Sequence, residues 1–104
     1  MKCFVTFRLK PGVSPEQYEE WFREQNVPAV RKMRSVERYR VWRATEAAEG
    51  QPPYHYIEEM EFEERGAFDR EVEELPEMNA MLEGWYARVT DSAIVYAVEV
   101  DQVA

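Results

Sequence analysis

Glu58 has the setting best suited to proton transfer in this 104-residue chain. It lies in the segment from Tyr54 to Phe62, where the other residues at even numbers are aromatic or apolar. Because a strand alternates its side chains between two faces, Glu58 should share their apolar face. A carboxyl group removed from water there has a raised pKa and could act as a general acid or base. The alternative is an ion pair with Arg40, which a hairpin loop centred near Glu49 would place opposite Glu58.

His55 and Asn26 are the other two polar candidates. His55 is the only histidine and has an ordinary pKa near neutrality, so it could also move a proton; alternatively, it is a half-exposed strand residue. Asn26 directly precedes Val27 and Pro28, where it could hold a substrate carbonyl or a water, or equally cap the helix that follows. Four aromatic residues, each of which could instead belong to the core, complete the predicted substrate-binding set: Phe22, Tyr56, Trp85 and Tyr96.

Several classes of site are not expected. One His and one Cys leave only carboxylates for a metal, at no spacing typical of a metal site, so no metal is predicted. The four glycines are scattered and form no phosphate-binding loop, and no cofactor is predicted. The net charge of −8 and the absence of a basic stripe with interleaved aromatics argue against a nucleic-acid partner.

Cys3 bears on the location of the protein. As the only cysteine it can form no internal disulfide, which fits a reducing cytoplasmic location. It lies in an alternating apolar segment, and this favours a small buried hydrophobic residue over a nucleophile. The first ten residues contain no apolar run long enough for a signal peptide or a membrane span, so no membrane association is predicted.

The elements that must position these residues alternate between strands and helices. The pattern predicts strands at 2–9, 36–45, 54–63 and 92–100. The first helix should begin at a capping box formed by Ser14 and Gln17, and Pro28 should kink or break it near Asn26. The second should follow Gly66 and be interrupted at Pro76. This order predicts one ferredoxin-like α+β domain over residues 1–104, an antiparallel sheet with both helices on one face.

Both faces of the predicted sheet carry large apolar side chains, although its own helices would cover only one. Phe4, Trp42, Tyr54, Tyr56, Met60 and Phe62 alternate with Val5, Phe7, Tyr39, Val41, Ile57, Tyr96 and Val98. A bare apolar face on a monomer favours aggregation, and packing two sheets face to face removes it. A homodimer is therefore predicted.

Four segments resemble a known superfamily: Val-Thr-Phe-Arg-Leu-Lys-Pro-Gly-Val-Ser (5–14), Glu-Trp-Phe-Arg-Glu-Gln-Asn-Val-Pro-Ala-Val-Arg-Lys-Met (20–33), Tyr-His-Tyr-Ile-Glu-Glu-Met-Glu-Phe (54–62) and Leu-Pro-Glu-Met-Asn-Ala-Met (75–81). They resemble the dimeric α+β barrel superfamily, and within it the RedY-like proteins of prodigiosin-type pathways, which are related to EthD-like proteins. The resemblance implies a homodimer with a ligand cavity between helices and sheet. Its members include polyketide cyclases, monooxygenases and muconolactone isomerase-like enzymes, and the fold does not choose among them.

The known catalytic residues of the superfamily are not found at the corresponding positions of this sequence. The Tyr and His that a plant polyketide cyclase of this superfamily uses correspond to Val72 and Met78, and the second helix lacks the His that would ligate haem iron. We therefore predict a secondary-metabolism protein with a pocket for a small apolar or aromatic ligand. It would promote a cofactor-free cyclisation, condensation or isomerisation of an aromatic or polyketide-like metabolite. Glu58 or His55 would move the proton and Asn26 would hold a polar substituent. The alternative is a non-catalytic ligand-binding or stress-type dimer.

Overall fold

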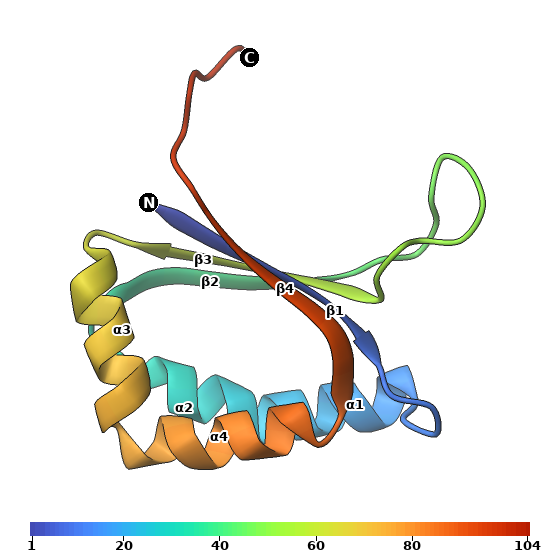
Figure 1. The fold of residues 1–104 in the computed structure, drawn as a ribbon, viewed down its shortest axis with the longest axis horizontal. Coiled ribbons are helices and arrows are strands. Elements are labelled where there is room, and N and C mark those ends of the chain that lie inside the picture. Colours follow the sequence, from blue (N-terminus) through green and yellow to red (C-terminus); the bar gives the residue numbers. More distant parts are fainter.

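A computed structural model describes residues 1–104 and shows a four-stranded sheet with helices on one face (Figure 1). The strands are β1 (Lys2–Leu9), β2 (Val36–Arg43), β3 (Tyr56–Phe62) and β4 (Val89–Ala97). All neighbouring strands are antiparallel, in the order β2-β3-β1-β4. This topology confirms the ferredoxin-like α+β fold predicted from the order of the elements. None of the helices combines the length and the apolar composition needed to cross a membrane.

The first helix begins where the capping box places it. Ser14 Oγ accepts a hydrogen bond from the backbone N–H of Gln17, and the Gln17 side chain accepts one from the backbone N–H of Ser14. These two bonds satisfy donors that the helix itself leaves unpaired. They fix the start of α1 (Pro15–Trp21) as the sequence predicts.

The interruption expected before Pro28 is a short π-helical segment, after which the α-helix continues. The π-helix η1 (Phe22–Asn26) joins α1 to α2 (Val27–Arg31), and the backbone N–H of Val27 bonds to the carbonyl of Phe22, five residues back. Pro28 has no N–H to donate, and its ring clashes with a carbonyl in a regular α-helix. A wider turn just before it relieves the clash and lets the helix continue.

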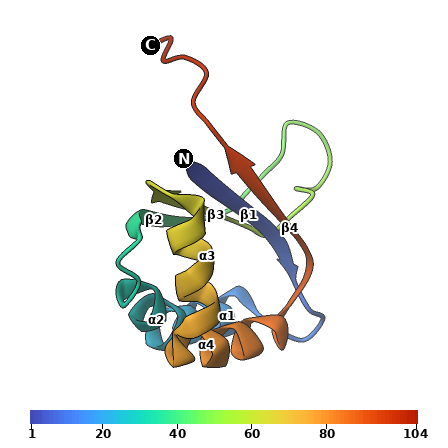
Figure 2. The same ribbon diagram turned by 60° about the vertical axis from the view of Figure 1, so that its left-hand side comes forward.

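Pro76 divides the second helical segment as predicted. α3 (Arg65–Glu74) ends before Leu75, whose backbone is extended, and Pro76 is the first residue of α4 (Pro76–Tyr86). The chain changes direction at this point, so α3 stands at one end of the sheet while α4 runs beneath it beside α2 (Figures 1 and 2).

The hydrophobic core fills the space between the sheet and these helices. The side chains of β1 and β3 that face the helices are all buried: Cys3, Val5, Phe7, Leu9, Tyr56, Glu58, Met60 and Phe62. The division of the sheet into two faces made from the sequence is therefore partly wrong. Tyr56, Met60 and Phe62 lie on the same side as Val5 and Phe7, whereas the open face carries Phe4, Trp42, Ile57 and Val95.

Three strands have other bounds than predicted. β2 ends at Arg43, two residues before the predicted end. β4 covers Val89–Ala97, three residues earlier than expected, so Val98 and Val100 lie beyond it and are exposed. The chain after β4 extends away from the body of the molecule (Figures 1 and 2). Tyr54 precedes β3 and belongs to the connection between β2 and β3.

Candidate functional site

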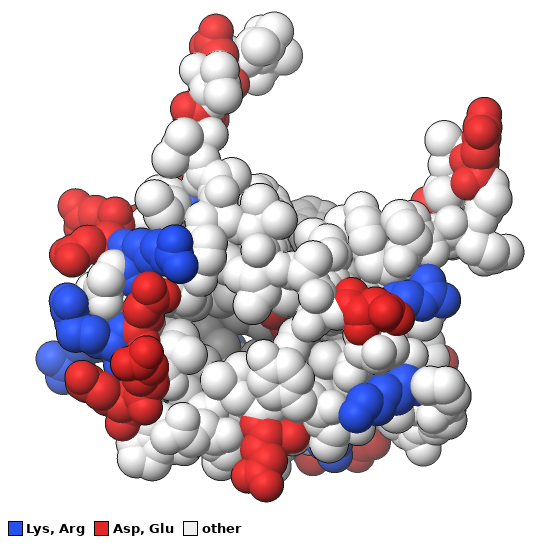
Figure 3. All heavy atoms as spheres, in the orientation of Figure 1, with Lys and Arg blue, Asp and Glu red and all other residues white.

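A cavity of about 250 Å³ lies between the sheet and helices α2, α3 and α4. It opens as a hollow in the face of the molecule that Figure 3 shows. Fifteen of its nineteen lining residues are hydrophobic, so a ligand inside exchanges water mostly for apolar contacts. The lining residues are Cys3, Val5, Asn26, Val30, Met33, Tyr39, Glu58, Met60, Phe68, Asp69, Val72, Glu73, Met78, Met81, Leu82, Trp85, Tyr86, Ile94 and Tyr96.

Helical spacing explains how α4 forms one wall. Met78, Met81, Leu82 and Trp85 follow one another by three, one and three residues, which places them on one side of a helix. Methionine side chains are flexible and polarisable, and they adapt to irregular apolar shapes. The cavity wall is therefore suited to holding an apolar molecule of varied outline.

Glu58 projects from β3 into this apolar space, as strand alternation predicts. Its side chain is buried, with only 5 % of the residue exposed, and its Oε1 accepts a 2.8 Å hydrogen bond from the Tyr39 hydroxyl. The other carboxylate oxygen, Oε2, has no hydrogen-bond partner in the chain, yet it is not sealed from the cavity that Glu58 lines. Burial raises the pKa of Glu58 to about 7, and the hydrogen bond from Tyr39 lowers it in part. Glu58 is therefore a carboxyl group that exchanges its proton near neutral pH.

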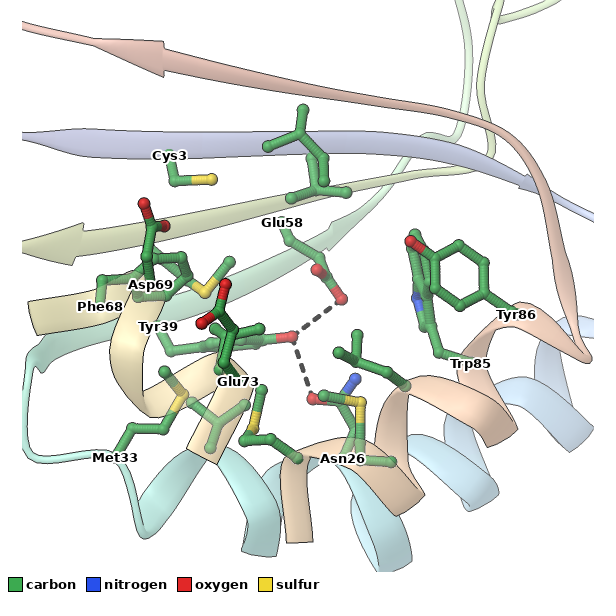
Figure 4. A pocket seen from close by; sticks show the side chains of 18 of the residues that line it. Cys3, Asn26, Met33, Tyr39, Glu58, Phe68, Asp69, Glu73, Trp85 and Tyr86 are labelled. Carbon is green, nitrogen blue, oxygen red and sulfur yellow. Dashed lines mark hydrogen bonds between the residues drawn. The ribbon is translucent and has the colours of Figure 1, made fainter. Parts of the chain in front are cut away.

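Asn26 meets the same hydroxyl from the helical side. It is the last residue of η1, it is 2 % exposed, and its Oδ1 lies 3.1 Å from the Tyr39 hydroxyl as an acceptor. Its amide nitrogen has no partner in the chain and is likewise not sealed from the cavity. The side chain makes no capping hydrogen bond to α2, so the alternative role as a helix cap is wrong. Figure 4 shows Glu58 descending from the sheet and Asn26 rising from the helices toward Tyr39.

Tyr39 is the site residue that the sequence analysis missed. A tyrosine hydroxyl has one hydrogen, so it can donate to Glu58 or to Asn26 but not to both at once. Strand alternation placed Tyr39 with Val41 on one face of β2, and the structure places Val41 opposite Glu58. The correct pairing of β2 with β3 would have been enough to bring Tyr39 beside Glu58.

The proposed ion pair between Glu58 and Arg40 does not form. Arg40 is opposite Glu59, and its side chain belongs to the open face of the sheet. The register differs by one residue from a hairpin centred near Glu49, and such a shift moves every side chain to the other face. Glu58 consequently has no cationic partner. The chain also brings together no three His, Cys, Asp or Glu side chains that could hold a metal ion.

The other predicted site residues are divided between two places. Trp85 and Tyr96 line the cavity with Glu58 and Asn26. Phe22 and Tyr56 instead line a smaller cavity of about 180 Å³ beside Glu19, whose carboxylate accepts a 2.8 Å hydrogen bond from the Tyr56 hydroxyl. Sequence reasoning grouped these four residues because it did not show where each helix crosses the sheet.

His55 lines neither cavity. Its Nδ1 accepts a 2.8 Å hydrogen bond from the backbone N–H of Leu9, and burial followed by the charge of Arg8 lowers its pKa. A neutral imidazole that accepts a backbone hydrogen bond joins the end of β1 to the segment before β3. The structure therefore separates His55 from Glu58 and gives it a structural contact.

Sequence comparison identifies the family. A family model described as REDY-like protein HapK matches residues 1–100. The chain belongs to this family. No curated protein matches it.

Solved structures share the fold over nearly the whole chain. HapK from Hahella chejuensis superposes with a TM-score of 0.73 at 20% sequence identity, covering 100% of this chain and 99% of HapK. A dimeric ferredoxin-like protein from Thermobifida fusca gives 0.74 at 18% identity, covering 93% and 89%. An EthD family protein from Bacillus halodurans gives 0.72 at 15% identity, covering 94% and 99%. At these identities the likeness shows the fold.

Proposed function

We propose that this HapK family member binds a small, largely apolar molecule in the cavity and transfers a proton next to its carbonyl group, without a cofactor. Such a step initiates isomerisation, cyclisation or condensation of a metabolite. The observation that carries the proposal is the free Oε2 of Glu58, a buried carboxyl oxygen open to an apolar cavity and belonging to a group with a pKa of about 7. A general base works best when its pKa lies near the operating pH.

The chemistry balances with the residues at hand. Oε2 of ionised Glu58 takes the proton from the carbon next to the carbonyl, the electrons of that C–H bond form a C=C bond, and the carbonyl oxygen becomes an enolate. The free N–H of Asn26 donates a hydrogen bond to that oxygen. Protonated Glu58 then returns the proton to another atom of the intermediate, which completes an isomerisation. Capture of a second carbonyl by the enolate carbon gives a cyclisation or condensation.

The cavity and the fold support a small substrate and a dimer. A volume of about 250 Å³ is below the roughly 300–1,000 Å³ of typical drug-sized sites, so a compact aromatic or polyketide-like molecule suits it. The open sheet face exposes Trp42 to 49 %, next to Ile57 on β3. We propose that two such faces pack together in a homodimer; a protein of the same fold that is described as dimeric supports the dimer itself. The buried thiol of Cys3 suits a cytoplasmic location.

Hydrogen exchange into a simple ketone tests the proposal. The protein is incubated with 2-tetralone in D₂O at pH 7, and NMR follows deuterium entry next to the carbonyl. We expect catalysed exchange by the unchanged protein and a loss of about 10²–10⁴-fold in Glu58→Gln, which keeps the shape of the side chain but cannot take the proton. Glu63→Gln is the matched control, because Glu63 lies just after β3 and is exposed.

The same experiment addresses the non-catalytic alternative. Binding of 2-tetralone is followed by tryptophan fluorescence, since Trp85 lines the cavity. Equal exchange by the unchanged protein and Glu58→Gln contradicts the role of Glu58. Equal binding by both proteins, with no catalysed exchange by either, identifies a ligand-binding protein.

A further inference from the structure

The charged residues that line the cavity are all acidic. Three of the nineteen lining residues carry carboxyl groups, namely Glu58, Asp69 and Glu73, and none is a Lys, Arg or His. Two buried residues, Glu58 and Asn26, each present one polar atom to the cavity. These atoms, Oε2 of Glu58 and the amide nitrogen of Asn26, have no hydrogen-bond partner in the chain. The cavity thus offers a ligand one hydrogen-bond acceptor, one hydrogen-bond donor and the negative charge of Asp69 and Glu73.

The negative wall belongs to α3. Phe68, Asp69, Val72 and Glu73 are spaced by one, three and one residues, so two apolar and two acidic side chains cover the cavity side of two successive turns. Figure 4 shows the carboxylates of Asp69 and Glu73 on the same side of the cavity. In Figure 3 charged side chains gather over α3 beside the hollow, while the surface on its other borders is largely uncharged.

The carboxylates of Asp69 and Glu73 differ in whether a basic side chain lies beside them. Arg65 lies 3.4 Å from Asp69, and its guanidinium also stacks 3.9 Å from the ring centre of Tyr96. Glu73 forms neither an ion pair nor a hydrogen bond. Glu73 is thus an exposed carboxylate at the cavity with no basic side chain within ion-pair distance.

We propose that the cavity selects a small apolar molecule carrying a cationic group, such as a protonated amine or a protonated nitrogen heterocycle, with Glu73 as the residue that attracts this group. The proposal deepens the proposed function, because it concerns the ligand of the same cavity. It does not depend on proton transfer by Glu58. Neutral apolar molecules enter with lower affinity, and anions such as carboxylates are repelled.

Two features of the site add to this selectivity. Tyr86 presents aromatic surface at the cavity, and ring faces attract cations; Arg65 over the ring of Tyr96 shows this contact within the chain itself. A cation in the cavity also favours ionised Glu58 over its neutral form. Binding of the preferred ligand would therefore increase the fraction of Glu58 that is ready to accept a proton.

Three probes of nearly equal shape test the charge preference. They are 1-naphthylmethylamine, 1-naphthalenemethanol and 1-naphthoate, which at pH 7.5 are cationic, neutral and anionic. Titration calorimetry at low salt should give the tightest binding for the amine, about threefold weaker binding for the alcohol and at least about tenfold weaker binding for the carboxylate. Added salt should reduce these differences, because it screens partly exposed charges.

Glu73→Gln should reduce the preference for the amine over the alcohol by about threefold and leave the alcohol affinity unchanged. Glu74→Gln is the matched control, since it removes the same charge from the same helix at a residue that does not line the cavity. Tighter binding of the carboxylate, an unchanged preference in Glu73→Gln, or no binding of any probe would overturn the proposal. A confirmed preference without ketone exchange would defeat only the proposed proton transfer, and exchange without the preference would defeat only the charge selectivity.

Discussion

The hydroxyl of Tyr39 lies 2.8 Å from Oε1 of Glu58, although the two residues are not directly opposite each other in the sheet. Tyr39 is opposite Met60, and Glu58 is opposite Val41, so the hydrogen bond runs diagonally between β2 and β3. Diagonal neighbours are farther apart than direct pairs and are reached by long side chains. A tyrosine spans this separation with a rigid ring, and it thereby holds the carboxyl group at a fixed place in the cavity.

The raised pKa of Glu58 predicts a stability difference that depends on pH. The pKa is about 7 in the folded protein and 4.5 for the unperturbed group, so the folded state binds more protons between these values. The contribution of Glu58 to stability is complete below pH 4.5 and is lost as the pH rises through 7. Glu58→Gln lacks this loss and should be more stable than the unchanged protein at pH 8, by at most roughly 3 kcal/mol. Urea unfolding of both proteins at pH 4.5 and pH 8 measures the difference, and an equal difference at both pH values would contradict it.

Tyr39→Phe should raise the pKa of Glu58 further, because the hydrogen bond from Tyr39 favours the ionised form. It should also cost about 1–2 kcal/mol of stability, since Glu58 and Asn26 share the single hydroxyl hydrogen of Tyr39 and the variant removes it. The carboxyl carbon of Glu58, followed by NMR through a pH titration, reports the pKa directly. Tyr86→Phe serves as the control: Tyr86 lines the same cavity, but its hydroxyl makes no hydrogen bond within the chain. A titration at lower pH in Tyr39→Phe would show that Tyr39 stabilises the neutral acid.

Cys3 should react slowly in the folded protein. Burial raises the pKa of its thiol from 9.0 to about 11, which lowers the thiolate fraction near neutral pH about 100-fold. Alkylation by iodoacetamide, followed by mass spectrometry, should therefore be at least about 100-fold slower in buffer than in strong urea. Because Cys3 lines the cavity, a bound ligand should slow the reaction further. Similar rates in buffer and in urea would show that the cavity end of β1 is open.

The homodimer predicts a specific effect of charge on the open sheet face. The unchanged protein should sediment at about twice its monomer mass of 12.4 kDa, since stable interfaces bury more than about 1,000 Å². Trp42→Lys places an ammonium group near the C-terminal end of β2 on this face and should shift the protein to monomers. Val103→Lys, which changes an exposed residue of the tail, should leave the mass unchanged. A monomeric unchanged protein would contradict the proposed packing of two sheets.

Local signals were sufficient to predict much of the fold. Ser14 and Gln17 fix the start of α1 through contacts three residues apart, and Pro76 acts on the helix in which it lies. The burial of Glu58 was predicted from Tyr56 and Met60, which lie two positions away on either side and share its face of the strand. Each of these predictions depends on neighbours in the sequence, and each matches the structure.

Long-range geometry was harder to obtain from the sequence. The connection from Ala44 to His55 has no short turn motif that sets the register of β2 against β3, and an error of one residue paired Glu58 with Arg40. The same error hid Tyr39. Phe22 was assigned to the main site, but its ring lies at a tilt to the Tyr39 ring, with the ring centres 6.2 Å apart, and it lines the second cavity.

The π-helix before Pro28 has a consequence for mutations that change the length of the chain. Its bond from Val27 back to Phe22 spans one residue more than an α-helical bond, so η1 has the effect of a single-residue insertion in a regular helix. The wide turn of η1 accommodates this additional residue; without the wide turn, one inserted residue in a regular helix would rotate everything on one side of it by about 100° relative to the other. Asn26 and the apolar face of α1 could then no longer both point inward. The amide beside Glu58 therefore depends on the number of residues in this helix as much as on their identity.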